Sequence, residues 1–452
     1  MKPTLRGLTC LLLCVSAPAL AQPLLDLQAR ALDGDPGVRA ARAQAQVAGH
    51  RVHQAQAAFG PTATLTGNSS RTRYTELPEA DLRVFRADQW AVQVNLPLLR
   101  GSLWPALETA QAQQQQAEAA LAQARADAMQ RFVEALLEVL KARDARSHAD
   151  VLHEAQAEQL AAVRRSYQVG RAAVTEVREA EARRDIALAQ YQAADADLDL
   201  RQQVLAELTG QPAPGLLGRA LGVDALPSLE GEGVHDWLAR ALAGNPNVRQ
   251  AELALDAAQA EARRAQLAHA PTLEGNVTWS RSSDSGTTTT FFPRRGNSSA
   301  IGVTLTVPLF AGGATQSRVE ESLALVEKAR AELDLARRTL NIGVRQAYVT
   351  VMSAVAQARS LAAAERSQAL SLRANQRGYE IGMRVNADVL DAQGKLFEAR
   401  RDMSRARHEA WAGWFRLRAL SGALVEADML RLEALLADAP PAATLRGRQA
   451  LP

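Results

Sequence analysis

Cysteine, aromatic residues and long apolar runs are scarce in this chain of 452 residues. Its two cysteines, Cys10 and Cys14, both lie close to the N-terminus, and aromatic residues make up only 4% of the sequence. Hydrophobic residues nevertheless make up 47%, and much of that share is alanine. Alanine favours helices and lets them approach closely, but it contributes little hydrophobic stabilisation per residue. The composition therefore favours long helices packed side by side over a globular core.

The N-terminal residues 1–21 have the parts of a secretory signal peptide. Lys2 and Arg6 supply the positive charge, an apolar stretch follows over 8–15, and Ala19 and Ala21 form a small-residue cleavage site. The alternative, a membrane anchor, is disfavoured because the apolar stretch is too short to span a bilayer as a helix. Cleavage would also remove both cysteines, which excludes a disulfide, a thiolate metal site or a cysteine nucleophile from the mature chain.

The charge balance excludes some partners. Removing Lys2 and Arg6 leaves 50 of the 52 basic residues against 49 acidic ones. Nucleic acid is therefore not expected as a partner, because it requires a clustered basic surface. No stretch after residue 21 has the apolar length of a transmembrane helix. An exported protein of this kind is soluble in the periplasm, secreted, or a β-barrel in the outer membrane.

Proline is absent from two long segments, 106–211 and 309–439. Proline interrupts helices, so its absence permits helical rods. A helix over 106–168 would be about 95 Å long at 1.5 Å per residue. Gly170 and Gly382 mark the turns after which a second helix returns. Helices of this length need other helices to pack against, which predicts helical hairpins in a larger assembly.

The chain also repeats itself at an offset of about 210 residues. Residues 30–39 and 240–249 share Arg, Ala, Leu, Gly, Pro, Val and Arg at matching positions. Later matches are Leu96-Pro97-Leu98 with Val307-Pro308-Leu309, Tyr167 and Gly170 with Tyr379 and Gly382, and Leu208-Thr209-Gly210 with Leu420-Ser421-Gly422. The sequence thus predicts two copies of one unit, over 22–222 and 223–436, and a flexible tail over 437–452.

Each unit is predicted to open with a helix, over about 36–59 and about 246–269. Two strands follow in each unit, with approximate ranges of 62–72, 88–97, 272–282 and 298–308. Apolar and polar residues alternate along them, as a barrel with a lipid face and a water-filled interior requires. Trp90 and Trp279 mark a membrane girdle, and the polar segment 282–297 is expected to be an external loop. An amphipathic hairpin of a soluble protein is the alternative for any single strand.

Two helix–strand–strand–hairpin repeats behind a signal peptide resemble the TolC family of outer-membrane export and efflux proteins, in its type I secretion and efflux branch. The most specific match is the turn at 379–393, with Tyr379, Gly382 and Arg384 followed by Asp388 and Asp391. The resemblance implies a mainly α protein with a β-barrel part. Each protomer would give four strands to a shared twelve-stranded trimeric barrel, and the long helices would form a periplasmic tunnel.

The resemblance also implies a gate at the periplasmic tip. Asp388 and Asp391, three residues apart on one helical face, would form acidic rings that favour cations. Tyr379 and Arg384 would tie this turn to the neighbouring hairpin. Further tip residues are the tether partners Thr175 and Glu176, the additional acid Glu179, and the arginines Arg178, Arg183 and Arg184 that would offset it. At 176 the family usually has aspartate.

The partners implied by the resemblance are two further copies of the chain, outer-membrane lipid, a periplasmic adaptor, and an inner-membrane pump driven by ATP or protons. The adaptor would dock on the turns, through Val169 and Gly170 in the first and Ile381 and Gly382 in the second. The implied location is the outer membrane of a Gram-negative bacterium, with a large periplasmic part. Secreted proteins and small molecules are both open as cargo.

An enzyme, a metal site or a cofactor is not expected. His50 and His53 are three residues apart, but no third ligand is near them, and no nucleophile or phosphate-binding motif is present. The remaining histidines are His148, His153, His235, His269 and His408. The alternative to a duct is a periplasmic or secreted coiled-coil structural or adaptor protein, which would explain the helices but not the symmetric strands.

Overall fold

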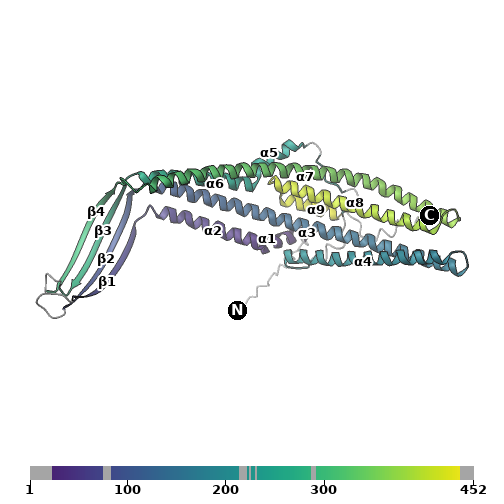
Figure 1. Ribbon diagram of the computed structural model, residues 1–452, viewed down its shortest axis with the longest axis horizontal. Helices are drawn as coiled ribbons and strands as arrows, with labels where there is room; N and C mark the ends of the chain where they lie inside the picture. Colours follow the sequence, from purple (N-terminus) through teal and green to yellow (C-terminus); the bar gives the residue numbers. More distant parts are fainter. Residues whose placement is uncertain are drawn as a thin grey trace, which may run out of the picture.

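A four-stranded sheet and a set of long helices make up the protein in a computed structural model that describes residues 23–74, 83–212, 221–222, 225–229, 232–286 and 292–437. The sheet lies at one end, and the helices run from it to the other end (Figure 1). The predicted signal peptide and the tail beyond Ala437 lie outside the described residues. Within the described ranges, no helix has an apolar stretch long enough to cross a membrane.

The two halves of the chain contain the same elements in the same order. The first half consists of α1 (Pro23–Gly34), α2 (Pro36–Ala57), β1 (Thr62–Tyr74), β2 (Arg83–Leu99), α3 (Leu103–Gln168) and α4 (Val174–Thr209). The second consists of α5 (Val234–Gly244), α6 (Pro246–Gln266), the short η2 (Leu267–His269), β3 (Thr272–Asp284), β4 (Arg294–Thr306), α7 (Ala314–Glu380) and α8 (Asn386–Leu420), and α9 (Glu426–Ala437) follows. Helices α3 and α7 have 66 and 67 residues.

Both repeats begin their second helix with the same cap. The Asp35 side chain accepts a hydrogen bond from the Val38 backbone N–H at 2.9 Å, and Asn245 accepts one from Val248 at 3.3 Å. Proline follows each cap. The backbone N–H groups of the first helical turn have no acceptor within the helix, so the missing N–H of proline costs nothing there. The repeated sequence 30–39 and 240–249 is thus a repeated helix start.

The strands pair antiparallel in the order β1-β2-β3-β4. They reach further from the helices than the sequence predicted, with β2 beginning at 83 rather than 88. The segment 282–297 was expected to be a loop, but its ends continue β3 to Asp284 and β4 from Arg294, with these two residues paired. The backbones of these residues pair between strands although their side chains are polar. A search for alternating apolar residues therefore does not find the ends of these strands. β4 ends at Thr306, two residues before the predicted end and just before Pro308.

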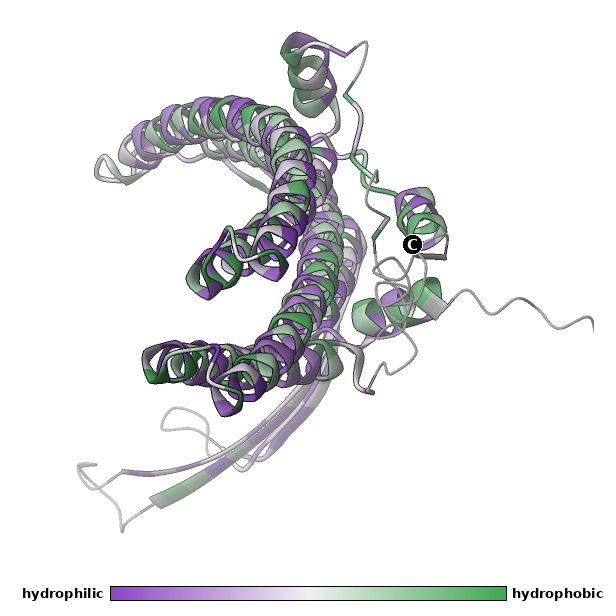
Figure 2. Cartoon of the chain, turned by 90° about the vertical axis from the view of Figure 1, so that its right-hand side faces the viewer, coloured by the Kyte–Doolittle hydropathy of each residue, from purple (hydrophilic) through white to green (hydrophobic). Residues whose placement is uncertain are grey.

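The long helices form a curved layer, seen from their far end in Figure 2. Helices α3 and α7 run along its whole length. Near the sheet, α2 packs against α3, and α6 packs between α3 and α7; further away, α4 packs against α3, and α8 packs between α3 and α7. Because α4 and α8 return from the turns at 169–173 and 381–385, the far half consists of two helical hairpins side by side.

The hydrophobic core lies around the middle of the rods. One cluster joins Phe132 and Leu136 of α3 to Trp411 and Phe415 of α8, with α1 and α9 packed on it. A second joins Trp237 of α5 to α7. The short helices lie on the convex side of the layer (Figure 2). Most of the largest fully buried side chains lie here.

Close backbone packing fixes the end of α8, where Gly422 has a φ of 64°. A Cβ on Gly422 would lie 2.2 Å from the Gly244 carbonyl oxygen. We expect Gly422→Ala to lower the thermal unfolding temperature, through both the left-handed backbone and the clash. Gly394→Ala is the matched control, since a Cβ there meets nothing within 4 Å and alanine stabilises a helix by about 1 kcal/mol relative to glycine. Equal effects of the two substitutions, measured by circular dichroism, would contradict this packing.

Candidate functional site

One face of the sheet is apolar across all four strands. The pairing register brings Leu65, Val92 and Trp279 into one row and Val94, Val277 and Ile301 into another. Most of the large side chains on this face are exposed, namely Leu65, Trp90, Val92, Leu96, Val277, Trp279, Ile301, Val303 and Leu305. The opposite face carries Thr64, Gln93, Asn95, Glu274, Asn276, Thr278 and Thr304. The alternation predicted from the sequence is therefore continuous from strand to strand.

The two tryptophans lie on the apolar face, in adjacent strands and at its end away from the helices. Trp90 is 56% exposed and Trp279 is 45% exposed, and the Trp90 ring lies over Gly67. Beyond them on the same face come Asp88 and Arg86, which form an ion pair of 3.1 Å. Charged side chains therefore follow the tryptophans directly along β2.

The far ends of the two hairpins have the same turn. Gly170 and Gly382 have φ values of 74° and 76°, a conformation that glycine adopts without strain. Each follows a helix closed by a backbone hydrogen bond across the turn, from Arg171 to Ser166 and from Met383 to Gly378, both 2.8 Å. The apolar side chains Val169 and Ile381 are 68% and 67% exposed, so each turn presents an uncovered hydrophobic residue.

The two predicted ring acids each have a basic partner. The Arg384 side chain lies over Gly378 and approaches Asp388 to 3.6 Å. Asp391 accepts a hydrogen bond of 2.8 Å from Arg183. All four of these charged side chains are more than a third exposed, so their interactions are screened by water and salt. The acids follow the start of α8, and both lie at the predicted tip.

The predicted tethers do not meet within one protomer. No hydrogen bond or ion pair joins Tyr379 or Arg384 to Thr175 or Glu176, all four of which the structure describes. Glu176 instead accepts a hydrogen bond from the Ala173 backbone N–H, at 3.4 Å, at the start of its own helix. A tether through these residues would therefore need a rearranged side chain or a neighbouring protomer.

Other contacts, which the sequence did not indicate, join the two hairpins near the tip. Gln156 of α3 donates to Gln393 of α8 at 3.0 Å, with both side chains buried. Gln159 donates to Asn386 one turn closer to the end. The first hairpin is closed internally by Glu181, which accepts from Arg164 at 2.7 Å and Arg178 at 2.9 Å. These two hydrogen bonds lower the pKa of Glu181.

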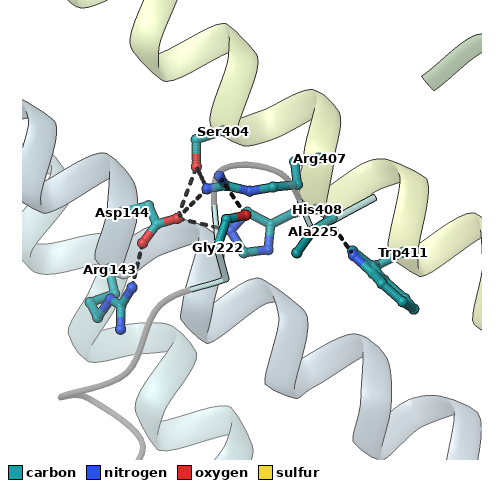
Figure 3. Close-up of polar contacts among 8 residues, drawn as sticks. All are labelled: Arg143, Asp144, Gly222, Ala225, Ser404, Arg407, His408 and Trp411. Atoms are coloured by element: carbon teal, nitrogen blue, oxygen red, sulfur yellow. Dashed lines mark hydrogen bonds and ion pairs between the residues drawn. The ribbon is translucent and has the colours of Figure 1, made fainter. Parts of the chain in front are cut away.

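A buried ionic cluster lies further from the tip, between α3 and α8 (Figure 3). Asp144 is 7% exposed and accepts from Arg143 at 2.6 Å, Ser404 at 2.9 Å, His408 at 3.1 Å and Arg407 at 3.3 Å. Burial by itself raises the pKa of Asp144, but the hydrogen bond from His408 and the nearby charges lower it well below its usual range. Asp144 is therefore ionised.

The cluster and the neighbouring Trp411 hold the described stretches 221–222 and 225–229 against α8. Arg407 donates to the Gly222 carbonyl at 3.2 Å, and Trp411 donates to the Ala225 carbonyl at 2.9 Å. Burial lowers the pKa of His408, and it lowers that of the nearby His148 to about 4. The sequence analysis named both histidines but not Asp144. A signal was present, because Asp144 continues the four-residue spacing of the buried Phe132, Leu136 and Leu140 on α3.

The remaining histidines form no metal-ligand set within the described residues. His50 and His53 have ring centroids 6.5 Å apart, and the His53 Nδ1 lies 3.3 Å from Gln56. Over the described part of the chain, no group of three or more His, Cys, Asp or Glu residues is placed to hold a metal ion.

The sequence matches the family described as "Outer membrane efflux protein" over residues 27–211 and 237–423. The chain is 27% identical to the outer membrane protein TolC of Vibrio cholerae, over 93% of this chain and 95% of that protein. It is also 27% identical to the protease secretion protein PrtF of Dickeya chrysanthemi, over 96% of this chain and 95% of that protein.

Solved structures with the same fold include the channel CusC, with a TM-score of 0.78 and 17% identity over 90% of this chain and 93% of CusC. The Campylobacter jejuni CmeC outer membrane channel gives a TM-score of 0.76, with 16% identity over 91% of this chain and 89% of CmeC. These likenesses confirm the fold predicted from the two repeats.

Proposed function

The chain belongs to the outer membrane efflux protein family, and we propose that it forms a trimeric channel-tunnel through which exported cargo crosses the periplasm and the outer membrane. The observation that carries this proposal is the sheet with one continuous apolar face, joined to two long helical hairpins. The protein is an outer-membrane component of type I secretion or tripartite efflux.

Closure of the barrel requires further copies of the chain. In one protomer β1 and β4 are edge strands, and exposed edges promote association with other strands. Three copies would close twelve strands into a barrel without edges. The apolar face runs from Trp90 to Leu99 of β2, which is about 30 Å along the strand. At a barrel tilt of about 40° this gives about 23 Å, close to the ~25 Å lipid-facing band of outer-membrane barrels.

The tip is the proposed gate. In a trimer, Asp388 and Asp391 would form two acidic rings, and rings of acidic side chains favour cations. Tyr379 and Arg384 would contact Thr175 and Glu176 when the turn is tied to an adjacent hairpin. The exposed Arg384, which pairs only loosely with Asp388 at 3.6 Å, is free to change partners on opening.

The turns offer a docking surface for a periplasmic adaptor that links the duct to an inner-membrane pump. Val169 and Ile381 each stand before a glycine and leave apolar surface exposed to solvent. The same turn occurs in both repeats, so a trimer would present six similar sites. The neighbours in sequence cover two cargo classes, as "Alkaline protease secretion protein AprF" of Pseudomonas aeruginosa and "Outer membrane efflux protein BepC" of Brucella suis illustrate. The pump and adaptor would select between them.

The alternative, a coiled-coil structural or adaptor protein outside the membrane, is tested by a charge placed on each face of the sheet. Ile301, 85% exposed on the apolar face, is replaced by arginine, which costs about 2–4 kcal/mol at the middle of a lipid-facing strand. We expect Ile301→Arg to reduce the protein in the outer-membrane fraction, while Thr304→Arg on the polar face remains inserted. Wild-type protein that is soluble without detergent would instead support the alternative.

A further inference from the structure

Arg183 is the residue through which α4 contacts α8 electrostatically. Its guanidinium lies 2.8 Å from the Asp391 carboxylate, and the two residues are 208 positions apart in the chain. Within the described ranges, this is the sole hydrogen bond or ion pair between α4 and α8. Nearby arginines of α4 bind acids within their own hairpin, since Arg178 pairs with Glu181 at 2.9 Å and Arg184 with Asp185 at 3.2 Å.

The internal repeat gives this pair a counterpart. Tyr167, Gly170 and Leu208 match residues 212 positions later. The same offset carries Arg183 to Lys395 and Glu179 to Asp391. Both repeats therefore have an acid and, four residues later, a base on the returning helix of the hairpin, which places the two charges on one helical face.

The counterpart charges have no partner among the described residues of the protomer. Neither Glu179 nor Lys395 takes part in a hydrogen bond or ion pair within the described residues, although Arg183 and Asp391 do. A trimer of two-repeat chains places α4 and α8 alternately around the tip. Two steps around the tip are then related by the repeat. The first runs from α4 to α8 within a protomer, and the second runs from α8 to α4 of the next protomer. The first step brings Arg183 to Asp391, so the second brings Lys395 to Glu179 of the partner subunit.

We propose that six ion pairs close the resting tip, three within protomers between Arg183 and Asp391 and three between protomers from Lys395 to Glu179 of the partner subunit. This rests on the proposed trimeric channel. The pairs would act as a latch, because opening must separate the hairpins. They would also neutralise the Asp391 ring in the closed state, while Asp388 keeps its looser 3.6 Å pair with Arg384.

Chemical cross-linking tests the two kinds of pair separately, in the detergent-purified full chain. The mature sequence is predicted to lack cysteine, so introduced thiols are the only ones. A short bis-maleimide is used, because the long Arg and Lys side chains separate the backbones further than a disulfide allows. We expect Glu179→Cys with Lys395→Cys to give covalent dimers and trimers on denaturing gels. Arg183→Cys with Asp391→Cys should give a cross-linked monomer, and the control Arg184→Cys with Asp391→Cys should give little product.

Single-channel conductance tests the consequence. Three exposed ion pairs together would shift the equilibrium between the closed and the open tip by about tenfold. Arg183→Gln should therefore raise the conductance severalfold. Arg183→Asp with Asp391→Arg should restore the low wild-type value. Restored conductance with inter-subunit cross-links supports the latch. A wild-type trimer that conducts but gives neither result overturns the latch and leaves the channel in place. Protein that is monomeric and does not conduct overturns the proposed function itself.

Discussion

Replacing Asp144 by alanine should destabilise each protomer by about 3–5 kcal/mol, the usual effect of removing one partner from a buried ion pair. Asp144 is 7% exposed and accepts hydrogen bonds from four side chains. Without the carboxylate, the cations of Arg143 and Arg407 would remain close together and largely buried, with no compensating negative charge. Among the described residues, Arg407 Nε and His408 Nδ1 already lack a hydrogen-bond partner, so few alternative contacts are available.

The matched control is Asp195→Ala. Asp195 also accepts from an arginine, Arg146, at 2.9 Å, but its side chain is 47% exposed. Exposed pairs contribute about 0–1 kcal/mol, so this variant should unfold close to the wild-type temperature. Thermal unfolding of detergent-purified protein, followed by circular dichroism at 222 nm, compares them. Similar unfolding temperatures for both variants would mean that the cluster contributes no more than a surface pair.

The same substitution should loosen the contact between α8 and the stretches 221–222 and 225–229. Arg407 and Trp411 of α8 hold the carbonyls of Gly222 and Ala225, and Asp144 orients Arg407. We therefore expect faster cleavage around 221–229 in Asp144→Ala under limited proteolysis. The effect should appear at temperatures where the helices are still folded, which separates local release from global unfolding.

The fold was largely predictable because its signals are repeated. The proline-free segments, the paired Asp35-Pro36 and Asn245-Pro246 caps, and the glycine turns all depend on local backbone rules that the sequence expresses twice. Strand ends were less predictable. Pairing between residues such as Asp284 and Arg294 depends on a neighbouring strand, and polar side chains give no alternation to reveal it.

The tip was predictable in its residues but not in their partners. Asp391 was expected in an acidic ring, and the structure pairs it with Arg183. A spacing rule within one helix does not find this pair, because Arg183 belongs to the other repeat. The cluster around Asp144 was missed for a related reason. An acid on a buried stripe is a visible signal, yet its basic partners Arg407 and His408 lie more than 260 positions away.

Loosening the tip should produce the largest functional change. Tyr379 and Arg384 belong to the turn that the proposed gate ties to an adjacent hairpin, and the Arg384 side chain also contacts Asp388. We expect Arg384→Ser combined with Tyr379→Phe to raise the single-channel conductance severalfold, because both changes remove polar groups of the proposed tether and leave the turn backbone intact. The control Arg377→Ser removes a similar charge from the end of α7 and should leave the conductance near the wild-type value.

The most direct test of a gated export duct is single-channel recording of the wild-type protein beside Arg384→Ser with Tyr379→Phe in a planar lipid bilayer. The account predicts a small, cation-preferring conductance for the wild type and a larger one for the double variant. Folded, membrane-inserted trimers that carry no current in either form would contradict the duct, and current that the double variant leaves unchanged would move the constriction away from this tip.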